Sequence, residues 1–359
     1  MKSDLRWLPW VGLLVFLWGG IPAAVPVQSQ SISFGSGLNA CPAPIAPVVL
    51  DHSVLITNCT RAGIQAALDQ GGEIAFDCGS GAVTIPIDQT LELSTRTNTV
   101  IDGGGKITLD GQGQVRLFHK GWHDPVSVGT IQVTFQNLRL INGRAPGGGD
   151  TGEQSGGAIN SGHPGTRLVI IDSTFENDTT TDVHTPDNQG GAIFSHNSYE
   201  TVISGSVFQD NLAGNGGAIG GIATGLVVFN SRFTHNRAVD DAAGDIVRGY
   251  GGAIHLDGVS NGYNPASSNR LHLCGNIFEQ NSSIRGGGAV SVVISDNLGT
   301  RAIYEKSTFT DNQALGMDGS FGQGGAIYHI EDDHAGGSTE ENLLISGDTF
   351  HGNQALRQG

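Results

Sequence analysis

Two short motifs alternate along the second half of the chain, and they constrain its fold more than any other feature. Six glycine pairs open the tetrapeptides Gly-Gly-Ala-Ile or Gly-Gly-Ala-Val, and each is followed by a segment that ends in Phe-x-x-Asn or, once, in FEND. Self-similarity of this kind is typical of a repeat architecture. The glycine pairs are Gly156 with Gly157, Gly190 with Gly191, Gly216 with Gly217, Gly251 with Gly252, Gly287 with Gly288 and Gly324 with Gly325. The second motif comprises Phe175 in FEND, then Phe208 with Asn211, Phe233 with Asn236, Phe278 with Asn281, Phe309 with Asn312 and Phe350 with Asn353.

Each repeat contains a strand that must stack on the strand of the next repeat. Apolar residues stand seven and five positions before each Phe, as Leu226 and Val228 do before Phe233, except that Thr201 takes the first of these positions before Phe208. This spacing puts them on one strand face. The shortest repeat, from Gly190 to Gly216, is too small to bury such a face alone. Stacking at about 4.8 Å per rung gives a parallel β-solenoid, with each Phe pointing inward against the Phe of the next rung.

Three corners per repeat follow from the same pattern. The glycine pair marks a corner at which no Cβ fits. Small turn-forming residues two positions before each Phe mark a second corner. At the third, we expect Asn to take the left-handed backbone and to bond to the Asn of the next rung.

The upstream sequence extends the stack. A degenerate repeat covers residues 133–143, with Leu140 in the place of Phe. Residues 60–72 predict a short helix that Thr60 caps, that Gly71 ends and that covers the open sheet edge. Its apolar stripe is Ile64, Ala67 and Leu68. Because 56 of the 359 residues are Gly, a mostly helical chain is excluded. The fold class is therefore all-β, a single-stranded parallel β-helix with a short N-terminal capping helix.

The N-terminus predicts export. Lys2 and Arg6 precede a short apolar run, and small and Pro residues follow it. Apolar character continues to Val27, so an uncleaved membrane anchor is the alternative to a signal peptide. The expected organisation is a signal peptide over 1–29 with an uncertain cleavage site, a Pro- and Ser-rich leader over 30–58, and the β-helix over 59–359, with repeats from about 130.

Four cysteines suit an exported protein. Cys59 and Cys78 flank one compact segment and are the first choice for a disulfide. A Cys41–Cys59 pairing is the alternative, because four cysteines allow three connectivities. Cys274 stands one residue from the inward Leu273 and should face outward, where an unpaired thiol would be reactive or would pair between chains.

The charge balance bears on partners. With 18 Lys and Arg against 34 Asp and Glu, the net charge of −16 argues against a nucleic-acid partner, which needs clustered cations. We expect no cofactor, and calcium is the one metal ion for which the sequence offers a candidate site. Glu331, Asp332 and Asp333 form the candidate calcium site, because calcium prefers clustered carboxylates. Asp240 and Asp241 form a second acidic group, and a solvated acidic surface is the alternative reading of both groups.

The position just after each Gly-Gly-Ala-Ile or Gly-Gly-Ala-Val should face outward if the Ile or Val faces inward. It holds Asn160, Phe194, Gly220, His255, Ser291 and Tyr328. Phe194, His255 and Tyr328 are candidate ligand-binding residues, because exposed rings stack on sugars. The alternative is a set of ordinary exposed residues.

The chain stops where the next Gly-Gly-Ala-Ile would begin. An uncovered solenoid edge promotes aggregation. We therefore expect either a longer natural protein or a partner that covers this end. Contact with a membrane is expected only through the N-terminal signal or anchor, or through a part beyond residue 359.

The alternation of these motifs resembles the repeat of the chlamydial polymorphic outer membrane proteins, over roughly residues 130–359. The Cys59–Cys78 segment and the sequence VIDGGG look similar to the opening of many bacterial proteins of the pectin-lyase-like superfamily. The resemblance implies a right-handed parallel β-helix, export to the cell surface or outer membrane, and adhesion.

Pectin-lyase-like folds also host lyases and glycosidases, so the fold alone leaves activity open. The polygalacturonase family carries Asn-Thr-Asp, Gly-His-Gly and Arg-x-Lys motifs that this sequence lacks. Asp240–Asp241 and Asp332–Asp333 match only its Asp-Asp motif and are the weak catalytic candidates. We expect a secreted or surface adhesin-like module without enzymatic activity that binds extracellular carbohydrate or protein. The alternative is a secreted lyase or glycoside hydrolase, pectate lyase-like or polygalacturonase-like, acting on uronate polysaccharide.

Overall fold

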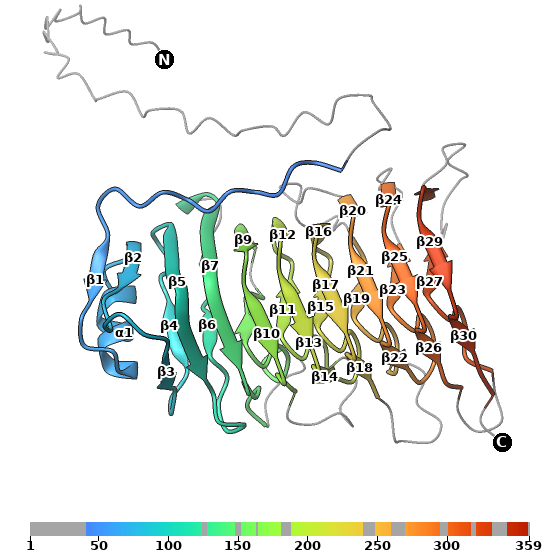
Figure 1. Ribbon diagram of the computed structural model, residues 1–359, viewed down its shortest axis with the longest axis horizontal. Coiled ribbons are helices and arrows are strands. Elements are labelled where there is room, and N and C mark those ends of the chain that lie inside the picture. Colours follow the sequence, from blue (N-terminus) through green and yellow to red (C-terminus); the bar gives the residue numbers. More distant parts are fainter. Residues whose placement is uncertain are drawn as a thin grey trace, which may run out of the picture. The chain divides into compact units, whose positions relative to one another are not determined.

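The computed structural model describes residues 41–123, 128–147, 152–162, 164–180, 188–239, 248–259, 270–294, 301–316, 321–331 and 343–357. The expected signal peptide, residues 1–29, lies outside them. Within the described residues the chain forms parallel β-sheets and a single helix, α1 (Arg61–Leu68). The all-β parallel β-helix expected from the repeats is therefore confirmed, and its rungs follow one another from β1 to β30 (Figure 1).

The strands lie in four parallel rows along the stack, each strand pairing with its equivalent in the neighbouring rungs. The first row comprises β1 (Val54–Ile56), β2 (Gly72–Phe76), β5 (Thr99–Asp110), β7 (Ile131–Ile141), β9 (Thr166–Ile171), β12 (Glu200–Ser204), β16 (Gly225–Phe229), β20 (Arg270–Cys274), β24 (Arg301–Glu305) and β28 (Leu343–Ser346). The Phe row comprises β3 (Val83–Pro86), the second halves of β5 and β7, β10 (Thr174–Glu176), β13 (Val207–Gln209), β17 (Arg232–Thr234), β21 (Ile277–Glu279), β25 (Thr308–Thr310) and β29 (Thr349–His351).

The other two rows follow the glycine corner and the Asn corner of each repeat. From β8 on, each strand of the GGA row begins at the Ile or Val of a glycine motif. The row comprises β4 (Leu91–Leu93), β6 (Phe118–Lys120), β8 (Ile159–Asn160), β11 (Ile193–His196), β15 (Ile219–Ile222), β19 (Ile254–Asp257), β23 (Val290–Ile294) and β27 (Ile327–Glu331). The short row follows each Asn and comprises β14 (Leu212–Ala213), β18 (Arg237–Ala238), β22 (Ser282–Ser283), β26 (Gln313–Ala314) and β30 (Gln354–Ala355).

The core is built from the positions that the repeat predicts. Neighbouring Phe rings of the Phe row stack nearly parallel, with centroids 4.7–5.0 Å apart, and Leu140 of the degenerate repeat pairs with Phe175. The inward residues of the first row, such as Leu226 and Val228, are also fully buried. Stacked aromatic pairs contribute about 0.5–1.5 kcal/mol beyond the area they bury.

The Asn residues form a buried ladder, as expected. Asn236 donates its backbone N–H and its side-chain amide to Asn281 Oδ1, both at 3.0 Å, and Asn281 donates in turn to Asn312. The expectation that Asn itself takes the left-handed backbone is wrong: the residue before it does, as at His235 and Gln280 with φ of 56° and 54°. Because that exposed residue makes the turn, the Asn side chain is left pointing inward to its neighbours.

The glycine pairs form tight corners for two separate reasons. Gly251 has φ of 65°, which L side chains rarely adopt, whereas a Cβ on Gly252 would lie 2.1 Å from the carbonyl oxygen of Gly288 in the next rung. The first glycine is therefore required by backbone conformation and the second by the close approach of the stacked rungs.

The N-terminal end is capped as predicted. Thr60 accepts a hydrogen bond from the backbone N–H of Gly63 at 3.2 Å, and the expected apolar stripe of α1 is buried against the first strands. Gly71, with φ of 68°, follows the helix. The stack begins earlier than the expected boundary at residue 59, because β1 pairs with β2. No helix among the described residues has the length and apolar character to cross a membrane.

Residues 41–50, here called the strap, cross the outside of the first row (Figure 1). The backbone N–H of Ile45 donates to Ser204 Oγ at 2.9 Å, and Val48 exchanges two hydrogen bonds with the Gln136 side chain. Ile45 and Cys41 pack on an outward apolar cluster. Its buried members are Val169, Ile171, Val202, Val227, Phe229 and Cys274. Residues 41–50 of the expected leader are therefore a structural part of the β-helix.

Two disulfides are present, Cys59–Cys78 and Cys41–Cys274, with Cα atoms 5.8 Å and 5.6 Å apart. The first is the pair chosen from the sequence, and the alternative Cys41–Cys59 pairing is wrong. Cys274 does face out of the core, but it is fully buried because the strap covers it. Sequence spacing could not find this bond, because its partners are 233 residues apart and meet only through the stacking.

Candidate functional site

A cavity of about 350 Å³ opens on the outer side of the GGA row, near its N-terminal end. Its wall is Trp122, whose side chain is 64% exposed, and its floor includes Phe194. The remaining lining residues are Gly152, Glu153, Asn160, Gly162, Pro164, His196 and Asn197. Most ligand sites combine apolar and aromatic walls with a few polar groups, as this cavity does.

The floor follows from the register of the GGA row. His119 pairs with Asn160, and Asn160 pairs with Phe194, so these side chains stand side by side on consecutive rungs. Asn160 donates to the carbonyl oxygens of Gly152 at 2.7 Å and Ser155 at 3.1 Å. It thereby fixes the loop that carries Glu153 against the floor.

The loop that carries Trp122 is held by its neighbours. Lys120 is fully buried, and its Nζ lies 3.1 Å from both the carbonyl oxygen of Gly121 and His123 Nδ1. Burial lowers the pKa of Lys120 to about 8. His123 Nε2 lies 3.3 Å from the carbonyl oxygen of Gly129, which ties down the far side of the loop. Trp122 is therefore an exposed ring on an anchored loop.

A chain of ionisable groups borders the cavity. His119 Nδ1 lies 2.9 Å from Glu92 Oε2, and His119 Nε2 lies 4.0 Å from Glu153 Oε1. Beneath them, buried Arg116 donates to the carbonyl oxygens of Gly156 and Ser155, both at 3.0 Å. Burial lowers the pKa of Arg116 to about 10, against the opposing effect of Glu153 and Glu92. Arg116 thus supports the loop, while the half-exposed Glu153 carboxylate faces the cavity.

The structure brings Phe194, His255 and Tyr328 onto one continuous row, but the expectation that this row faces solvent is wrong. Phe194 is 1% exposed and His255 is 5% exposed. Tyr250, which stands just before the glycine pair at Gly251, lies over the row and stacks on both His255 and Tyr328, with centroids 6.0 Å and 5.9 Å away. Burial lowers the pKa of His255 to about 4, so this imidazole is neutral at neutral pH. Of the three candidates, Phe194 lines the cavity described above.

The acidic candidates are not brought into a site by the described structure. Asp240, Asp241, Asp332 and Asp333 lie outside the described residues. Glu331 is the last residue of β27. The calcium site and the Asp-Asp catalytic candidates therefore stay predictions.

A second cavity, of about 440 Å³, lies along the corner between the Phe row and the short row. Its lining is amide, hydroxyl, imidazole and carboxylate groups, among them His235, Gln280, Asp311 and Gln313. Its described lining contains no Phe, Tyr or Trp ring against which the apolar face of a ligand could pack, so it is the weaker candidate for a ligand site.

Sequence reasoning missed Trp122, although one signal was available. Three of the four tryptophans lie in the first 18 residues, which leaves Trp122 as the only one in the rest of the chain. It follows the short strand β6 in a polar segment, HKGWHDP, where an aromatic ring has no core position to fill.

The fold and the cavity define the class of protein: a disulfide-bonded parallel β-helix with an aromatic-walled, polar-lined cavity on one face. Comparison of the sequence with models of known protein families and with curated proteins finds no match.

Proposed function

We propose that this protein is an exported, adhesin-like β-helix module that binds carbohydrate in the Trp122 cavity. The observation that carries the proposal is an exposed tryptophan on an anchored loop, facing a cavity with carboxylate, amide and imidazole groups. A sugar ring has an apolar face that stacks on indole and an edge of hydroxyl groups that needs hydrogen-bond partners. Glu153, His196 and Asn197 supply such partners in the lining of the cavity.

The charge of the cavity favours one class of sugar. Its described lining includes the carboxylate of Glu153 and no lysine or arginine. The whole chain carries a net charge of −16. Uronate sugars would be repelled, since like charges disfavour association and no cation neutralises their carboxylates. The proposed ligand is therefore a neutral or amino sugar within a surface polysaccharide or glycoprotein.

Export to an extracellular or cell-surface location is part of the proposal. It is supported by the signal-like N-terminus and by two disulfides, which persist in oxidising compartments. The resemblance of the repeats to those of the chlamydial polymorphic outer membrane proteins favours the same location and an adhesive role.

A second candidate, a glycoside hydrolase at the same cavity, is favoured by the Glu92–His119–Glu153 chain. Glycoside hydrolysis uses two carboxyl groups, one of which holds a proton. His119 lies between two carboxylates, 2.9 Å from Glu92 and 4.0 Å from Glu153, and Glu153 faces the cavity.

Both candidates are tested with one panel of neutral, amino-sugar and uronate oligosaccharides. Isothermal titration of the full chain should show binding to neutral or amino sugars. Trp122→Ala should weaken that binding roughly tenfold or more, because stacking contributes on the order of 1.4 kcal/mol. Phe321→Ala is the matched control, since it removes a ring of similar exposure, 66%, outside the cavity lining.

Equal affinity of Trp122→Ala and the parent chain would refute the binding site. Reducing-end release from the same oligosaccharides, lost in Glu153→Gln, would favour the hydrolase. Binding without release favours the adhesin-like module.

A further inference from the structure

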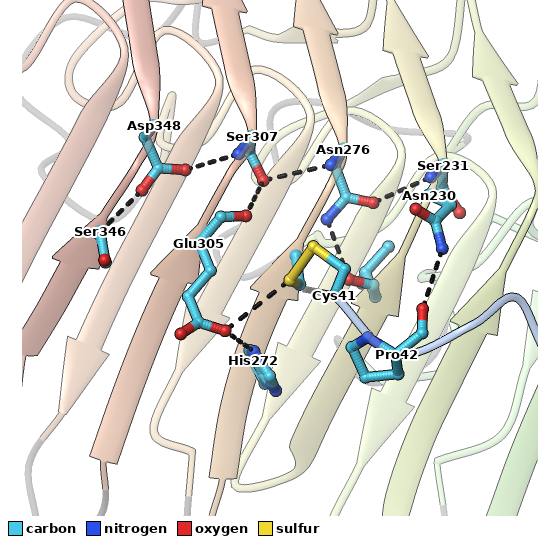
Figure 2. The surroundings of a disulfide bond; sticks show 12 residues. Cys41, Pro42, Asn230, Ser231, His272, Asn276, Glu305, Ser307, Ser346 and Asp348 are labelled. Carbon is cyan, nitrogen blue, oxygen red and sulfur yellow. Dashed lines mark hydrogen bonds and ion pairs between the residues drawn. A yellow bond between two sulfur atoms is a disulfide. The ribbon is translucent and has the colours of Figure 1, made fainter. Parts of the chain in front are cut away.

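Side chains of metal-ligating type surround the disulfide that holds the strap (Figure 2). His272 and Cys274 stand two positions apart on β20 and point to the same side, and Glu305 of β24 is the register partner of Cys274. His272 Nε2 lies 3.0 Å from Glu305 Oε2, and Cys274 Sγ lies 3.7 Å from the same oxygen. Ligand atoms of these three residues all lie within 4.8 Å of one another, and Cys41 adds a second sulfur at the same place.

This cluster is preorganised and largely dry. Cys274 is fully buried, His272 is 6% exposed and the Glu305 side chain is 21% exposed. The ring of Phe229 packs edge-to-face against His272 with centroids 5.5 Å apart, which helps to fix the imidazole plane. Because β20 and β24 belong to the continuous first row, the three backbone positions are set by the sheet and not by a loop.

We propose that, when the Cys41–Cys274 disulfide is reduced, Cys41, Cys274, His272 and Glu305 bind one zinc ion that fastens the strap to β20 in place of the disulfide. Two sulfurs, one imidazole nitrogen and one carboxylate oxygen form a four-ligand set of the kind that tetrahedral zinc takes in proteins. Two thiolates and one carboxylate also offset the charge of the ion in this buried place.

The reaction needs an external reductant, which is a dithiol. The dithiol gives two electrons to the S–S bond and becomes a cyclic disulfide, and its two protons pass to the sulfurs of Cys41 and Cys274. Zinc then displaces both thiol protons to solvent, while the His272 nitrogen binds in its neutral form.

Cys41 stays within reach after reduction because other contacts hold the strap. The backbone N–H of Ile45 donates to Ser204 Oγ at 2.9 Å, and Asn230 Nδ2 donates to the carbonyl oxygen of Pro42 at 3.4 Å. Ile45 also packs on the outward apolar cluster. The second sulfur is therefore held close to the other three ligands before the metal arrives.

The test uses cobalt(II) as a spectroscopic probe for the zinc site in the full chain. After treatment with a dithiol and its removal without air, the reduced chain should bind one equivalent of cobalt. It should show thiolate-to-cobalt absorption in the near ultraviolet and the visible bands of tetrahedral cobalt, and zinc should displace both. The oxidised chain should show neither band.

His272→Gln and Glu305→Gln should each weaken cobalt binding roughly tenfold or more. Circular dichroism before reduction checks that both variants are folded while the disulfide is intact. The double variant Cys59→Ser/Cys78→Ser is the matched control and should keep the full signal. No thiolate band in the reduced chain, or a signal that depends on Cys59 and Cys78 and not on His272, would overturn the proposal.

Discussion

The substitution Asn281→Ala removes one buried amide from the Asn ladder and tests whether these amides hold the stacked rungs together. Asn281 is fully buried. Its Oδ1 accepts from the backbone N–H and the side-chain amide of Asn236, and its Nδ2 donates to the carbonyl oxygen of Phe233 and to Asn312 Oδ1, all at 3.0 Å. Alanine removes these four hydrogen bonds and keeps the backbone bond from residue 281 to Asn312.

The expected loss follows from what each partner retains. The Asn236 amide keeps its bond to the carbonyl oxygen of Phe208, and Asn312 Oδ1 keeps its backbone donor. The backbone N–H of Asn236 loses this buried acceptor, which costs about 1–3 kcal/mol, and each other lost bond costs about 0.5–1.5 kcal/mol. Asn281→Ala should therefore lower the free energy of unfolding by about 2.5–7.5 kcal/mol, a large part of a typical domain's stability.

Asn353→Ala is the matched control, because Asn353 is the half-buried last member of the same ladder. Water can replace its partners, so the expected loss is only about 1 kcal/mol. Urea unfolding followed by circular dichroism measures both variants, and hydrogen exchange shows whether the loss is confined to the rungs beside residue 281, as a stack of nearest neighbours requires. Equal destabilisation by the two variants would falsify the claim that buried amides hold the rungs together.

Three further changes probe other parts of the stack. Phe278→Ala removes a ring stacked on both sides and should cost about 3–5 kcal/mol in urea unfolding, whereas Phe350→Ala, at a ring that is 47% exposed, should cost less than half as much. Asp178 stands in the ladder where later repeats carry Asn, and burial raises the pKa of its carboxyl while Gly143 N–H donates to it at 2.6 Å. A carboxyl whose pKa is raised in the native state contributes stability that is present below its unfolded pKa and is lost as pH rises through its native pKa. Asp178→Asn should therefore be more stable than the parent at neutral pH, and its free energy of unfolding should depend less on pH. A steeper dependence on pH would contradict this reading. Thr60→Ala removes the cap of α1 and should lower the melting temperature by the equivalent of about 1 kcal/mol, while an unchanged value would show that the cap is dispensable.

Most of the fold could be predicted from local pattern. The spacing of apolar residues before Phe233 set the inward face, and the glycine pairs and Asn residues set the corners, because each depends on backbone conformation or strand period. The capping helix was also found locally, from Thr60 and its apolar stripe.

The candidate site was less accessible to the same reasoning. Phe194 lies in the lining of the cavity, but the sequence expectation that its ring is exposed was wrong, because Phe194 is buried. Whether an outward side chain meets water depends on what folds over it, and no strand period reports that. Trp122 becomes part of a cavity only because Asn160 and Phe194, from two other rungs, line the same cavity.

The sequence by itself determined the repeat and the inward Phe and Asn ladders, and it favoured the disulfide between Cys59 and Cys78, because these are properties of residues close in the chain or repeated at a fixed spacing. Only the tertiary structure decided that the strap lies along the first row, that Cys41 meets Cys274 and that His272 and Glu305 join them. Stacking places residues of neighbouring rungs about 4.8 Å apart, the spacing of hydrogen-bonded strands, however far apart they are in sequence. The sugar-binding cavity and the metal site that we propose for this protein both combine residues from different rungs.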